Sequence, residues 1–134
     1  MSRHKAREHA FCLIFTHDFN TDLTASDTIE SYQEAEGVTL DSFACDTFCG
    51  TVDYIIQIDD TISRYAKSWK LARISKVSLA VLRLAFYELL YSELKEKNII
   101  INEAIELAKK YEDEKAASFV NGVLGAYAKD CANE

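Results

Sequence analysis

Apolar residues recur at helical spacing along almost the whole chain. In the first segment one stripe consists of Ala10, Leu13, Ile14 and His17, with Phe11 and Phe15 beside it. Residues three and four apart lie on the same face of a helix, so this pattern predicts an amphipathic helix in place of a strand. The residues just before the stripe then lie on the first turns of that helix.

The same periodicity predicts six further helices. The second begins near Asp22 or Thr24, either of which can accept hydrogen bonds from free backbone N–H groups, and it ends before Gly37. The others are expected over residues 41–59, 61–68, 77–91, 99–111 and 113–129. Within the segment 41–59 the spacing places Tyr54 and Ile58 on the inward face.

The helix at 77–91 is apolar on nearly all sides, because only Ser78, Arg83 and Glu88 interrupt its apolar and aromatic residues. A helix of this kind has to be surrounded by other helices, so we expect it at the centre of the fold. Ser75 is placed to cap its start. Arg83 and Glu88 are costly to bury alone, so we expect each to be paired.

Composition supports an all-α fold of about seven helices. The 134 residues include no proline and only four glycines, although turns between strands draw heavily on both residue types. A chain of this length forms one domain, here residues 1–134. We expect Gly122 and Gly125 to permit the close approach of a neighbouring helix. No stretch of the sequence is long and apolar enough to predict a membrane span.

Charge is distributed unevenly around a formal net charge of −7. Arg3, Lys5 and Arg7 open the chain, and residues 8–63 then contain twelve acids and no lysine or arginine. A second basic run, residues 64–76, carries five cations and no acid. Two short basic segments on an acidic body are typical of a protein that positions a phosphate backbone, although lysine and arginine also solvate ordinary helix faces.

The sequence contains no recognisable catalytic or metal-binding motif. The four cysteines, Cys12, Cys45, Cys49 and Cys131, lack zinc-site spacing, and we expect reduced thiols in a cytoplasmic protein. Glycine-rich phosphate loops and the common hydrolase signatures are absent. We therefore expect no metal, no cofactor and no catalytic activity.

Four segments, taken in order, resemble the NusB family of transcription antitermination factors. They are Arg3–Glu8, Val81–Leu90, Ile101–Tyr111 and Phe119–Leu124. Each alone is a generic helix, but their order in a chain of this length is specific. The resemblance implies two three-helix bundles around a shared central helix. It also implies an adaptor without catalysis that binds boxA-type RNA of ribosomal RNA transcripts with ribosomal protein NusE, and that promotes read-through by RNA polymerase.

The resemblance also assigns an RNA-contacting role to the basic start of the chain, Arg3, Lys5 and Arg7. Cations bind phosphates whatever the sequence, whereas stacking and base-edge contacts recognise unpaired bases. Phe15 and Phe119 are the candidates for stacking, and each also suits a core position. Lys76 extends the basic track. Asn121 is expected to be buried and hydrogen-bonded rather than in contact with RNA.

One alternative function remains open on the sequence alone. The chain contains fourteen Tyr and Phe residues, enough for an apolar contact patch in addition to a core. A helical protein–protein scaffold, or a self-associating dimer without an RNA role, is therefore the competing hypothesis. The two differ in whether RNA changes the state of association.

Overall fold

The computed structural model describes residues 1–93 and 96–133, and these residues form seven α-helices and one turn of 3₁₀ helix. The elements are α1 (Arg3–Asp18), α2 (Ala25–Glu36), α3 (Ser42–Asp53), α4 (Ile55–Tyr65), η1 (Leu71–Arg73), α5 (Lys76–Tyr91), α6 (Lys97–Tyr111) and α7 (Glu114–Ala132). The described residues contain no strand, so the predicted all-α class is confirmed.

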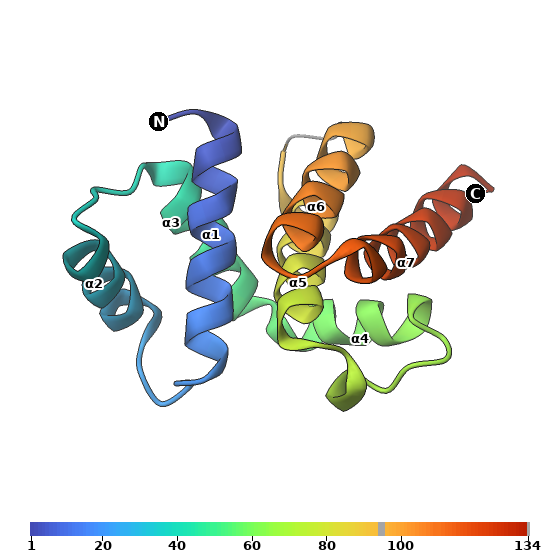
Figure 1. Cartoon of the computed structure of the whole chain (residues 1–134), viewed down its shortest axis with the longest axis horizontal. Helices are drawn as coiled ribbons and strands as arrows, with labels where there is room; N and C mark the ends of the chain where they lie inside the picture. The colour runs from blue at the N-terminus through green and yellow to red at the C-terminus, as the bar shows by residue number, and fades with distance from the viewer. Residues whose placement is uncertain (94–95, 134) are drawn as a thin grey trace.

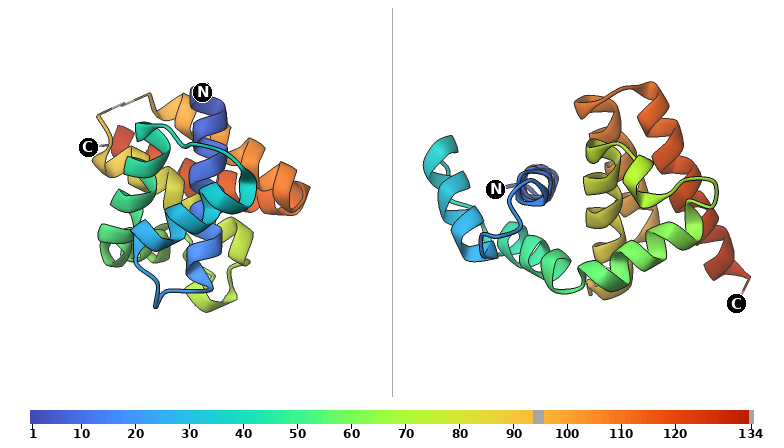
Figure 2. Two further views of the ribbon diagram at one scale, coloured as in Figure 1. Left: turned by 90° about the vertical axis from the view of Figure 1, so that its left-hand side faces the viewer. Right: turned by 90° about the horizontal axis from the view of Figure 1, so that it is seen from below.

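Two groups of three helices flank the central helix α5 (Figure 1). α1, α2 and α3 pack together on one side, and α4, α6 and α7 lie on the other. The end-on view in Figure 2 shows that α3 and α4 follow one another along the edge shared by the two groups. α5 contacts α1, α3, α4, α6 and α7. The arrangement confirms the predicted pair of bundles around one shared rod.

Local signals set most helix boundaries where the sequence placed them. Thr24 caps α2 in a reciprocal capping box with Asp27, and Gly37 ends α2 in the left-handed conformation at φ 64°. Ser75 accepts a hydrogen bond from the backbone N–H of Ser78 at 3.1 Å and so caps α5. These residues satisfy backbone groups that a helix end leaves without intrahelical partners.

The predicted helix over 41–59 is wrong, because the chain breaks at Tyr54. Tyr54 leaves helical geometry at φ −105° and ψ 21°, and a separate helix begins at Ile55. The break lets Thr51 and Ile58 be buried in different bundles. Tyr54 itself is 43% exposed rather than inward, and its ring stacks on Tyr91. No glycine or proline marks this break, so packing alone imposes it.

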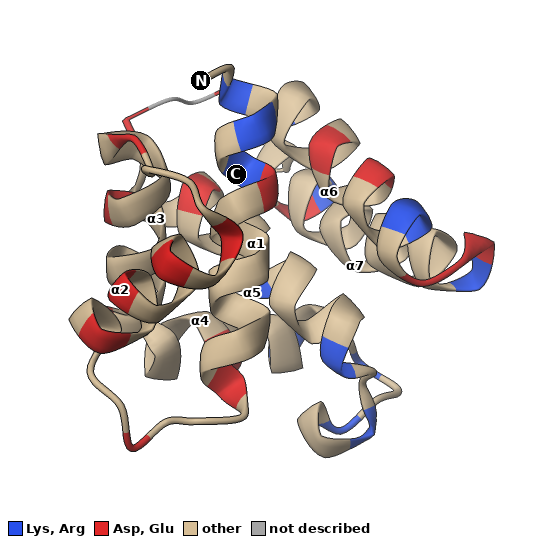
Figure 3. Ribbon diagram, turned by 60° about the vertical axis from the view of Figure 1, so that its left-hand side comes forward, with Lys and Arg blue, Asp and Glu red and all other residues tan. Residues whose placement is uncertain are grey.

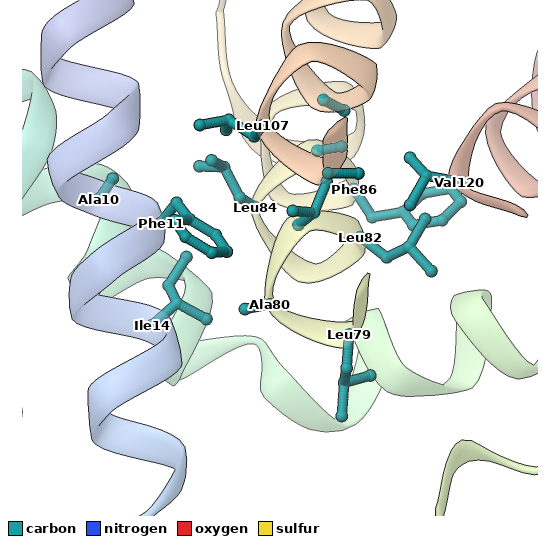
Figure 4. Packing of buried hydrophobic residues seen from close by; sticks show 14 of the residues in the cluster. Ala10, Phe11, Ile14, Leu79, Ala80, Leu82, Leu84, Phe86, Leu107 and Val120 are labelled. Atoms are coloured by element: carbon teal, nitrogen blue, oxygen red, sulfur yellow. The ribbon is translucent and has the colours of Figure 1, made fainter. Parts of the chain in front are cut away.

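Both faces of α5 are buried (Figure 4). Ala80 and Leu84 face Phe11 and Ile14 of α1, whereas Leu82 and Phe86 lie on the side of α7. Phe86 is fully buried, and truncation of a buried phenylalanine to alanine costs about 3–5 kcal/mol. The central rod therefore holds the two bundles together.

The two charged residues of α5 are paired, as the sequence predicts. The Arg83 guanidinium donates to both oxygens of Asp59 on α4 at 2.8 Å and to Asp18 on α1 at 3.1 Å. Glu88 pairs with Arg7. Arg83 thus ties one helix of each bundle to the central rod.

The expected close approach at Gly122 and Gly125 is wrong, because the space beside both glycines is open.

Candidate nucleic-acid interface

The first turn of α1 presents two exposed cations. The Arg3 guanidinium lies over the Phe43 ring, 4.0 Å from its centroid, so an aromatic face holds it without a carboxylate. The Lys5 ammonium is exposed and donates to Glu8 at 2.9 Å. Both side chains reach solvent, which is the position that a phosphate contact requires.

Arg7 is placed differently from the sequence expectation. Its side chain is buried beneath the first turns of α1, with 5% of the residue exposed, and it forms an ion pair with Glu88. Burial raises the pKa of the Glu88 carboxyl, and the hydrogen bonds from Arg7 offset part of that rise. The guanidinium therefore makes a structural contact, and this geometry argues against Arg7 as an RNA ligand.

Glu8 organises the cations around this end of α1. It is buried and accepts hydrogen bonds from Lys5 and from Lys110 of α6. Burial would raise its pKa, but hydrogen bonds from Lys110, Lys5 and Tyr111 outweigh burial and lower the pKa to about 2. Glu8 is thus ionised at neutral pH and holds two lysines from different helices side by side.

Lys76 and Phe15 both lie near Phe19 at the other end of α1. Phe15 is partly buried and its ring lies 5.1 Å from that of Phe19, while the Lys76 ammonium lies 6.0 Å from the Phe19 ring. Lys76 also pairs with Asp18 at 3.1 Å. Burial alone would raise the Asp18 pKa, but Lys76 and Arg83 lower it, so this carboxylate competes with any phosphate for Lys76.

Phe119 forms an aromatic pocket with a residue that the sequence analysis missed. The Trp69 ring meets Phe119 edge-on at 5.7 Å between centroids, and Trp69 is 51% exposed. The pocket has a volume of about 310 Å³, and its lining includes Arg73 and Lys115. The lining combines two aromatic rings and two cations, the groups that bind an unstacked base and its phosphates, with one carboxylate, Glu112.

The start of α5 separates this pocket from the one beside Phe15. Val77 lines the pocket at Phe15, which has a volume of about 600 Å³, whereas Ser75 and Ser78 line the pocket at Trp69. The two aromatic sites are therefore neighbours. The cations of the first turn lie further away, because Lys5 and Phe15 are separated by about 15 Å along a helix with a rise of 1.5 Å per residue.

Asn121 is exposed on α7, two residues after Phe119, so the expectation of a buried amide is wrong.

Acidic residues cover α2 and the segments beside it, whereas cations gather at the start of α1 and in the connection between α4 and α5 (Figure 3). A polyanion approaching this molecule is repelled from one side and attracted to the other.

Comparison with known proteins decides the family. The family model described as "NusB family" matches residues 4–129. The chain belongs to the NusB family. It is 42% identical to the transcription antitermination protein NusB of Bacillus velezensis, over 97% of this chain and 98% of the relative. It is 41% identical to the NusB of Bacillus subtilis, over 97% of each.

Solved structures of NusB proteins share the fold. T. maritima NusB superposes with a TM-score of 0.83 at 36% identity, covering 96% of this chain and 92% of that one. A crystal structure of antitermination factors NusB and NusE in complex with dsRNA gives a TM-score of 0.85 at 29% identity, covering 97% and 99%. NusB proteins are transcription antitermination factors without catalytic activity, and this chain is one of them.

None of the helices in residues 1–93 and 96–133 has the length and apolar character needed to cross a bilayer. The same residues contain no cluster of three or more histidine, cysteine or carboxylate side chains arranged to hold a metal ion. All four cysteines are free thiols.

Proposed function

We propose that this NusB protein binds single-stranded boxA-type RNA together with ribosomal protein NusE, within an antitermination complex on RNA polymerase. Residues 1–134 act as one RNA-binding domain, and the place of action is the cytoplasm, where transcripts are made. Support for NusE and RNA as partners comes from the related NusB–NusE structure with dsRNA. The observation that carries the preference for single strands is the pocket lined by Trp69 and Phe119.

The pocket favours an unpaired base for a physical reason. A base inside a duplex has both faces stacked, so neither ring of the pocket can reach them. An unpaired base gains about 1–3 kcal/mol from stacking on an aromatic side chain. Arg73 and Lys115 line the same pocket, so they are expected to contact the flanking phosphates.

The strand then continues across the start of α5 towards Lys76 and towards Phe15, which lines the neighbouring pocket. Arg3 and Lys5 hold a more distant part of the RNA, since both are exposed at the far end of α1. Arg7 takes no part, because Glu88 occupies its guanidinium.

The test uses Trp69 as its own reporter, because it is the only tryptophan. Titration with boxA-like RNA is expected to quench tryptophan fluorescence, and NusE is expected to tighten binding. Scrambled RNA and a duplex of the same length should bind more weakly. Phe119→Leu is expected to weaken boxA binding about tenfold, from the loss of one stacking partner.

The cationic end of α1 is tested separately. Arg3→Ala/Lys5→Ala should reduce the magnitude of the log–log salt slope by about 1.4, because each phosphate contact to a single strand contributes about 0.7. Lys129→Ala, an exposed lysine near the end of α7, is the control for lost charge. RNA affinity that is unchanged in Phe119→Leu and in Arg3→Ala/Lys5→Ala would contradict the proposed interface.

A further inference from the structure

A second aromatic surface lies where α3 meets the C-terminal half of α5, beside the hollow that Arg3 helps to line. Tyr54 and Tyr91 stack face to face there, with ring centroids 4.1 Å apart and an angle of 11° between the rings. They are 43% and 37% exposed. Tyr87 continues the row, 6.0 Å from Tyr91. Tyr54, Tyr87 and Tyr91 together form a tyrosine face.

The backbone of α3 is shaped to hold this face in place. Tyr87 lies directly against Gly50, and a Cβ at that position would clash with the Tyr87 ring. Glycine in a helix interior lowers stability by about 1 kcal/mol relative to alanine. Here it leaves the space that the Tyr87 ring occupies. The Tyr87 ring is therefore packed closely against the backbone of α3.

Two carboxylates border the tyrosine face without cations of their own. Asp46 and Asp53 are exposed on α3, and neither forms an ion pair with any described residue. Burial raises the pKa of the Tyr87 hydroxyl, and the negative charges of Asp46 and Asp53 raise it further. The face therefore combines aromatic rings with two carboxylates that form no ion pair with a described residue.

A hollow next to the face already accepts a guanidinium. It has a volume of about 470 Å³ and is lined by Arg3, Phe43, Asp46, Tyr87 and Tyr91, among others. The Arg3 guanidinium occupies its edge, 4.0 Å above the Phe43 ring. The chain itself thus shows how a planar cation sits on an aromatic ring at this place.

We propose that the tyrosine face, with Asp46 and Asp53, binds an arginine-rich segment of a partner protein. Guanidinium groups stack on aromatic rings and pair with carboxylates, and this surface offers both. RNA does not match the tyrosine rings themselves, because Asp46 and Asp53 border them and repel phosphate, and Arg3 lies only at the edge of the adjoining hollow. A second copy of the chain does not match it either, because a two-fold contact would bring like charges together. The inference does not rest on the proposed RNA contacts.

The experiment is an NMR titration of the full-length, ¹⁵N-labelled protein. The probe is a capped peptide of alternating glycine and arginine, and the control peptide carries neutral citrulline in place of arginine. The arginine peptide is expected to shift amide signals of α3 and of the C-terminal half of α5. Asp46→Asn/Asp53→Asn is expected to weaken binding about fivefold or more, and the exposed-ring variant Tyr54→Leu by a similar factor.

The matched control is Asp22→Asn/Asp60→Asn, which removes the same charge from exposed positions outside the face. It should bind the peptide as the unchanged protein does. Equal weakening in the control, equal binding of the citrulline peptide, or shifts spread over α2 would overturn the proposal. So would shifts of the tyrosine face that depend on protein concentration without peptide, because they would mark it as a self-association surface.

Discussion

The Arg7 guanidinium and the Glu88 carboxylate form a buried ion pair with three hydrogen bonds. Nε of Arg7 donates to both oxygens of Glu88, at 3.0 and 2.9 Å, and Nη2 donates to Oε1 at 2.9 Å. Arg7 belongs to α1 and Glu88 to α5, so this pair fastens the basic start of the chain to the central rod.

Arg7→Ala is expected to destabilise the protein by about 3–5 kcal/mol, because it leaves a buried carboxylate without its partner. Arg7→Met/Glu88→Leu, which removes both charges, should recover most of that loss. Urea unfolding of the two variants and the unchanged protein measures the difference. A double variant as unstable as Arg7→Ala would show that the pair does more than neutralise a buried charge.

Glu8 should make stability fall in acid. Its pKa is about 2 in the folded protein against an ordinary 4.5, so its contribution is fully present above about pH 4.5 and is lost as the pH falls towards 2. Glu8→Gln is expected to cost about 2 kcal/mol at pH 7, from lost hydrogen bonds to a charged group, and less at pH 3.

Urea unfolding at pH 7, 4 and 3 checks this, with the exposed Glu30→Gln as control. The comparison is made as unchanged protein minus variant, so the opposite contribution of Glu88, whose pKa burial raises, cancels. A deficit in Glu8→Gln that stays constant from pH 7 to pH 3 would contradict the assignment.

Two glycine substitutions should have opposite signs. Gly50→Ala is expected to destabilise by about 1–3 kcal/mol, because the added methyl group overpacks against Tyr87. Gly122→Ala is expected to stabilise by about 0.5–1 kcal/mol, because its Cβ points into open space on a helix. Thermal unfolding of both variants measures the shifts. Stabilisation by Gly50→Ala would mean that Tyr87 moves aside without cost.

Asp18→Asn should tighten RNA binding about two- to fivefold, because it removes a carboxylate that competes with phosphate for Lys76. Asp22→Asn removes the same charge from the exposed segment after α1 and serves as control. Fluorescence titrations with boxA-like RNA at fixed salt give both affinities. A larger gain in the control than in Asp18→Asn would remove Lys76 from the interface.

Most of the fold could be predicted because local and global signals agree. Capping residues such as Thr24 and Ser75 and the apolar rod at 77–91 each point to one structure. The break at Tyr54 could not be predicted, because its neighbours Ile55 and Ile56 continue a helical pattern. The break lets α4 pack on α5 and α7.

The candidate site was predicted less completely than the fold. The resemblance grouped Arg7 with Arg3 and Lys5 as RNA contacts, but Arg7 is buried whereas the other two are exposed. The partner that decides its role, Glu88, is 81 residues away. Trp69 carried a usable signal, since it is the only tryptophan and stands within the basic run 64–76. Its partner Phe119 comes from another helix, so the pocket itself was not visible in the sequence.

The separation of acidic α2 from the cationic segments gives this molecule a permanent electric dipole (Figure 3). If the net charge of −7 sat at a single point, it would repel a nucleic acid and slow association. Added salt would screen this repulsion and raise the association rate. The dipole instead turns the incoming strand towards the cationic side before any contact forms. Association should therefore slow as salt rises, although protein and RNA carry charge of the same sign.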